Sequence, residues 1–117
     1  MSASYLSRLQ QATAEIVRAR GELTRAATVA AETKFELDFK EAQLTAAGLE
    51  GSNENIRKAN LFLKTEEEVR AALFAEIALK QAQRDFDIAT AQFAALKYEL
   101  RSQELAVRSI ELRSAGQ

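Results

Sequence analysis

Closely spaced carboxylates are the first residues of this chain whose arrangement has chemical meaning. Glu32 and Glu36 are four residues apart and Asp38 and Glu41 are three apart, so each pair shares one face of a helix. Paired carboxylates of this kind are ligands for hard cations such as Ca²⁺ and Mg²⁺. Basic residues such as Lys34 lie among them, and a solvated, charge-balanced helix face explains the spacing better. We therefore predict no metal site and no cofactor.

The residue types that most enzymes need are missing from the chain. It has no His and no Cys, which excludes Glu-x-x-His metal centres of helical bundles and thiolate nucleophiles. General acid–base catalysis would then need a carboxylate or lysine with a pKa shifted by burial, and none stands isolated among apolar residues. Phosphate-binding glycine loops and nucleophile elbows are also absent from the sequence. We predict a non-enzymatic protein without catalytic residues.

The elements that carry these residues are predicted by a seven-residue repeat. Ala, the best helix former, is abundant, and the 117 residues include no Pro. In the first segment, apolar residues follow one another every seven positions, with a second row three places later. We call these the a and d rows. The a row is Leu9, Ile16, Leu23, Ala30, Leu37 and Leu44; the d row is Ala12, Ala19, Ala26, Thr33, Lys40 and Ala47. The pattern predicts a helix over residues 3–47, ended by Gly48.

The last segment repeats this pattern and predicts a second long helix over residues 65–113. Thr65 and Glu68 have the spacing of a capping box at its start. Its a row is Ala72, Leu79, Phe86, Phe93, Leu100 and Val107; its d row is Ala75, Ala82, Ala89, Leu96, Gln103 and Ile110. Two helices of similar length joined by a compact corner predict an antiparallel hairpin. The fold class is therefore all-α, with one helical-hairpin domain over residues 1–117.

The corner between the long helices has its own helical pattern. We predict a short helix over residues 53–63, capped by Ser52 or Asn53. Ile56, Leu61 and Leu63 are expected to cover the open end of the core. Arg57 is expected to bind the last carbonyl groups of the first helix or Glu67. An alternative is that polar residues of the corner, including Asn53 and Arg57, contact a partner.

The corner also resembles a known group of proteins. The run G-x-N-x-x-x-R, formed by Gly51, Asn53 and Arg57 and followed by Leu61, is similar to the corner of short phage-encoded helical-hairpin proteins, many of which have no assigned function. Such proteins are often encoded among genes for DNA replication and recombination. The resemblance implies a viral accessory protein in the host cytoplasm and no catalytic residue.

A third row in each helix predicts self-association. It lies five places after the a row, about 140° around the helix, and we call it the f row. A lone hairpin leaves it in water, and an exposed apolar strip of that length marks an interface. We predict a homodimer whose hairpins form a four-helix bundle. The predicted interface residues are Gly21, Phe35, Ile77, Ala91, Tyr98, Leu105 and Leu112. The alternative is that helix curvature brings the f row into the hairpin core of a monomer.

Arginines near the two chain ends form a second candidate surface. An antiparallel hairpin brings them to the end far from the corner, where they form a basic patch for nucleic acid or a protein partner. They are Arg8, Arg18, Arg20, Arg25, Arg101, Arg108 and Arg113. The net charge of −1 and neighbouring carboxylates such as Glu15 and Glu22 oppose nucleic-acid binding. Tyr5 and Tyr98 are the aromatic residues that accompany the patch.

These features together predict an interaction or scaffold protein, in line with the phage resemblance. Two alternatives stay open: a nucleic-acid-binding accessory protein that uses the arginine-rich end, and a phage inhibitor of a host protein. No apolar run approaches the ~18 residues that a membrane span needs, and the first residues lack the apolar core of a secretory signal. We therefore expect a cytoplasmic protein that partners with a second copy and with another protein.

Overall fold

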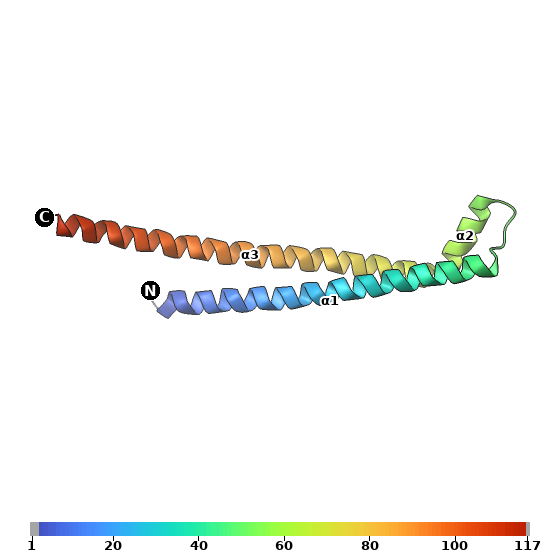
Figure 1. The fold of residues 1–117 in the computed structure, drawn as a ribbon, viewed down its shortest axis with the longest axis horizontal. Helices are drawn as coiled ribbons and strands as arrows, with labels where there is room; N and C mark the ends of the chain where they lie inside the picture. The colour runs from blue at the N-terminus through green and yellow to red at the C-terminus, as the bar shows by residue number, and fades with distance from the viewer. Residues whose placement is uncertain (1–2, 117) are drawn as a thin grey trace. The chain divides into compact units, whose positions relative to one another are not determined.

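A computed structural model describes residues 3–116 and confirms the all-α helical hairpin (Figure 1). The elements are α1 (Ala3–Ala47), α2 (Glu54–Lys64) and α3 (Glu66–Ala115). No strand occurs within residues 3–116. The three helices begin and end within two residues of the bounds that the repeat and the corner predict.

The chain groups into two compact units, although its repeat predicts one domain. One unit joins the part of α1 up to Gly21 with the part of α3 from Arg84 onward; the other runs from Glu22 to Gln83 and contains the corner. We call them the terminal unit and the corner unit. Segments of α1 and α3 lie side by side in each (Figure 1).

Burial follows the a and d rows in both units. In the terminal unit Ala19, Ala89 and Leu96 are buried, and in the corner unit Ala75 and Ala82 are buried. The large a-row residues of α3 up to Leu100, including Phe86 and Phe93, are half-buried between these positions. Alanines at the helix contact leave room for large side chains opposite, which is how such interfaces fill space.

The d and a rows of α3 lose their cover near its end, which differs from the predicted hairpin contact. Leu100 is half-buried, whereas every residue from Arg101 to Gly116 is exposed. Val107 and Ile110, which the repeat places in the helix contact, are 55% and 63% exposed. The reason is the register of the two helices: Tyr5, in the first turn of α1, lies beside Leu100 and Gln103, so the described part of α1 begins opposite the start of this stretch.

Glycine and asparagine build the corner. Gly48 ends α1 at φ 93°, a left-handed conformation that glycine adopts without strain, and its N–H donates to the Thr45 carbonyl oxygen over 3.2 Å. Asn53 caps α2, since its side-chain oxygen accepts from the Ile56 N–H over 2.9 Å. Asn60 Nδ2 donates to the Glu50 carbonyl oxygen over 2.7 Å, which ties α2 back to the loop before it.

The predicted apolar lid over the core is wrong. Helix α2 contains no buried residue: Leu63 is 66% exposed, Ile56 is also exposed, and Leu61 is half-buried. Arg57 is exposed as well, and the structure shows neither of its two predicted contacts. The local Asn53 and Asn60 bonds fix the corner instead, and they do not require the helix to fold over the core.

The predicted capping box at the start of α3 is also wrong. Thr65 is buried between α2 and α3, and both its N–H and its hydroxyl donate to the carbonyl oxygen of Leu61. Its N–H is therefore unavailable to Glu68. The Glu68 carboxylate accepts instead from Lys40 Nζ of α1 over 2.6 Å. Thr65 thus completes α2, while Glu68 joins the two long helices.

Candidate interaction surfaces

The f row of the terminal unit lies on the surface of α3. Tyr98 is 74% exposed, and Ala91, Leu105 and Leu112 are exposed along the same helix. Curvature does not bring these side chains into the hairpin core, which is the part of the monomeric alternative that exposure can test. The row is an apolar strip that water covers in a single chain.

The f row of the corner unit is exposed too, and it is wider than predicted. Ile77 of α3 has exposed apolar neighbours, Leu73 four residues and Phe74 three residues before it, so the three lie on adjoining parts of one helix surface. In α1, Phe35 is 69% exposed and stacks on the exposed Phe39, with ring centroids 6.0 Å apart. The sequence analysis missed Leu73, Phe74 and Phe39. Their signal in the sequence was helical spacing from f-row residues: Leu73 and Phe74 lie four and three residues before Ile77, and Phe39 lies four after Phe35.

Gly21 has open space around it. A Cβ added at this position would meet nothing within 4 Å. The close helix approach expected at Gly21 is therefore not made by the chain's own second long helix. The approach of a second copy at Gly21 stays a prediction from the sequence, and it is separate from the contact through α3 that is proposed below.

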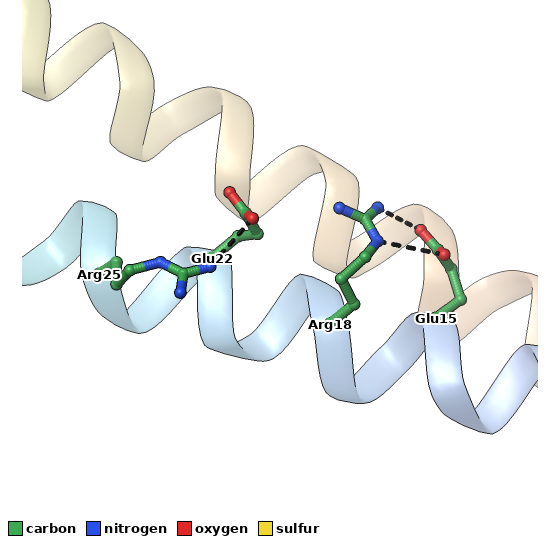
Figure 2. Close-up of polar contacts among 4 residues, drawn as sticks. All are labelled: Glu15, Arg18, Glu22 and Arg25. Atoms are coloured by element: carbon green, nitrogen blue, oxygen red, sulfur yellow. Dashed lines mark hydrogen bonds and ion pairs between the residues drawn. The ribbon is translucent and has the colours of Figure 1, made fainter.

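The predicted basic patch is partly neutralised by ion pairs. Arg18 pairs with Glu15, and Arg25 of the corner unit pairs with Glu22 over 3.0 Å (Figure 2). Both pairs have i, i+3 spacing, so the carboxylate and the guanidinium project from the same helix face. The hydrogen bond from Arg18 also holds the pKa of the Glu15 carboxyl below its usual range.

Arg8 belongs to a cluster that joins α1 to α3. Its guanidinium binds the Glu99 carboxylate at 2.9 and 3.4 Å and lies 5.2 Å from the centroid of the Tyr5 ring. The hydrogen bonds from Arg8 and then Tyr5 lower the pKa of the Glu99 carboxyl. Burial, followed by Glu99, raises the pKa of the Tyr5 hydroxyl. Tyr5, one of the two aromatic residues that accompany the predicted patch, is buried, so its ring is not exposed for a base to stack on.

The other predicted arginines differ in their surroundings. Arg101, Arg108 and Arg113 are exposed on the last part of α3, where Glu104 and Glu111 alternate with them. Arg20 is exposed on α1 and has an interaction of its own. The structure therefore forms no continuous run of unneutralised arginines from the predicted set.

The carboxylates considered as cation ligands lie on α1, exposed or half-buried. Glu32, Glu36 and Asp38 are exposed on α1, and Glu41 is half-buried. Within the described part of the chain, no three acidic, His or Cys side chains gather closely enough to hold a metal ion. Among the same residues, no helix combines the length and apolar character needed to cross a membrane.

Compared with models of protein families, with curated proteins and with solved structures, the chain matches none of them. The likeness of the Gly51–Arg57 corner to phage hairpin proteins therefore stays a prediction. Arguments about function rest on the surfaces described above.

Proposed function

We propose that this chain is a non-enzymatic helical interaction protein that associates with a second copy through the outward face of α3. The observation that carries the proposal is the row of exposed apolar side chains on α3, led by Tyr98 at 74% exposure. Large exposed apolar strips are uncommon on monomers and mark interaction sites. Tyr also supplies much of the binding energy where interfaces contain it.

Geometry separates the two f rows within each unit. The a rows of α1 and α3 face one another, and the f row lies about 140° from the a row on each helix. The two f rows therefore point away from each other. A second copy that covers the f row of α3 leaves Phe35 and Phe39 of α1 exposed, and we assign these two rings to a different protein partner.

A protein of this kind acts by holding its partners close to one another, without catalysing a reaction. A dimer built through α3 presents two copies of the Phe35–Phe39 pair, one from each chain, and so binds two partner molecules. Two linked sites raise the effective concentration of the second binding event. This fits a scaffold role, and a phage accessory role in DNA replication or recombination is the biological setting that the corner resemblance suggests.

Nucleic-acid binding is the weaker alternative. Three of the seven arginines considered for it are paired with carboxylates: Arg8, Arg18 and Arg25. To bind nucleic acid, those guanidinium groups would have to break their ion pairs with carboxylates and form new ones with phosphates. No feature of the surface specifically favours an inhibitor of a host protein over a scaffold.

The oligomeric mass tests the proposal. Light scattering coupled to size-exclusion chromatography on the full chain, from about 1 to 100 µM, should show a mass of at least twice 12.9 kDa that falls on dilution. A constant mass of one chain over this range, with helical circular dichroism retained, would refute self-association.

A further inference from the structure

In the last part of α3, the a and d rows run on beyond the part of the helix that α1 covers. Its a and d rows are covered by α1 as far as Leu96 and Leu100, and the same rows go on, uncovered, through Val107 and Ile110. We call the exposed stretch Arg101–Ala115 the α3 tail; the red end of α3 in Figure 1 belongs to it. An exposed helix of this length is marginal in water without packing.

We propose that a second copy of the chain completes this interface by laying its own α3 tail antiparallel across the first. A helix in antiparallel orientation is expected to cover the tail, because the tail extends the same a and d rows that already pack on α1 in that orientation. This deepens the proposed self-association but uses the a and d rows, on the side of α3 away from Tyr98, so the two contacts are independent.

The tail is complementary to itself. A two-fold axis that sets Val107 against Ile110 of a second copy also sets Ile110 against Val107 of that copy, so both uncovered apolar residues are buried twice. The same register sets Gln103 against Ser114, two side chains able to share a hydrogen bond. The apolar pair thus lies between polar pairs.

The end of α1 leaves room for the incoming helix. An open groove of about 370 Å³ is lined by Tyr5 of α1 and by Gln103, Val107 and Arg108 of the tail, among others. Tyr5 and Leu100 are still covered, whereas every residue from Arg101 to Gly116 is exposed, so the covered interface ends beside this groove. The tip of the second tail fits into this groove, in line with the first turn of α1.

The existing helix contact shows where charges meet. Arg8 and Glu99 directly precede the a-row residues Leu9 and Leu100, and they form an ion pair across the antiparallel helices at 2.9 Å. In the paired tails the equivalent positions are Ala106 and Arg113, each before an a-row position. A carboxylate at position 106 would therefore meet Arg113 of the second copy, twice in each dimer.

Introducing a negative or a positive charge at Ala106 is the test, carried out in the full chain with Tyr98→Asp added to disable the f-row contact. Sedimentation equilibrium should show association about 3- to 10-fold tighter for Ala106→Glu and weaker by a similar factor for Ala106→Lys. Salt at about 0.5 M should reduce the difference, because exposed pairs are screened. Equal association of the two variants at low salt would overturn the tail contact.

A second variant tests the apolar part of the same contact. Val107→Lys with Ile110→Lys, in the same Tyr98→Asp background, should abolish the remaining association while leaving helix content unchanged, because both residues are exposed in the single chain. Undiminished association would overturn the proposal, as would a Tyr98→Asp chain that is already monomeric at about 100 µM. Without Tyr98→Asp, the doubly substituted chain should still associate through the f row, so failure of one contact is distinguishable from failure of the other.

Discussion

Gly51 is the residue of the corner at which any side chain would be strained. Its φ is 139°, and a Cβ built there would lie 2.8 Å from Ile56 Cγ2 and 3.1 Å from the Arg57 nitrogen. The start of α2 thus approaches the loop too closely for any side chain. Local backbone geometry therefore explains why the corner motif has a glycine at position 51, without a binding partner.

Gly51→Ala should lower the free energy of unfolding by about 1–3 kcal/mol, because it adds both a strained φ and a steric contact. Urea unfolding followed by circular dichroism measures the change. Gly21→Ala is the matched control at protein concentrations where the chain is monomeric: the site is helical and open in the single chain, so the chain should gain up to ~1 kcal/mol. If Gly51→Ala is as stable as the wild type, the corner geometry described above is wrong.

The Lys40–Glu68 pair gives the hairpin a dependence on pH. The hydrogen bond from Lys40 holds the pKa of the Glu68 carboxyl below its ordinary value. A lowered pKa in the folded chain means that the pair stabilises the fold above the unfolded pKa, near 4.3, and that this contribution is lost as pH falls through the folded pKa.

Glu68→Gln should therefore reduce stability at neutral pH and flatten the loss of stability between about pH 5 and 3. Thermal unfolding across this range measures both effects. Glu67→Gln, one residue earlier and exposed, should leave the acid profile close to that of the wild type. A Glu68→Gln profile identical to the wild-type curve would contradict the stabilising role of the pair.

The fit between the helices depends on small residues at the contact. Ala89 is only 3% exposed, so a longer side chain has no room there. Ala89→Leu should cost about 1–3 kcal/mol of stability by overpacking, measured by urea unfolding. Ala95→Leu, on the exposed side of the same helix, should change stability by at most ~0.5 kcal/mol. Similar effects of the two substitutions would show that Ala89 does not lie in a packed contact.

The long helices and their contact faces were predictable because apolar residues recur every seven positions along both helices. Burial at Ala19, Ala82 and Ala89 follows directly from a period of seven in helices without Pro. The corner was harder, because it depends on competing local hydrogen bonds: Thr65 has a capping-box spacing, yet its hydroxyl and N–H serve α2. Periodicity alone also gave no register between the helices, so the uncovered tail beyond Leu100 was not foreseen.

At the scale of the whole molecule, the candidate site was predictable in part. The sequence shows the f row as a third apolar row of α3 and predicts that a lone hairpin leaves it in water. Tyr98 and Ile77 of this row are exposed. The flanking Leu73 and Phe74 were missed because they fall outside a strict seven-residue step. The ion pairs of Arg8, Arg18 and Arg25 were not predicted, since spacing along a sequence does not show which carboxylate a guanidinium will bind.

Self-association through the outward face of α3 is the central claim, and one comparison tests it most directly. Sedimentation equilibrium should be run on the full chain carrying Tyr98→Asp or Gln92→Asp, each adding one carboxylate to an exposed position of α3. We predict that Tyr98→Asp weakens association at least tenfold, because it buries a charge in the f-row contact, while Gln92→Asp changes it less than about twofold. Equal effects of the two substitutions, or an unchanged association constant for Tyr98→Asp, would contradict the claim.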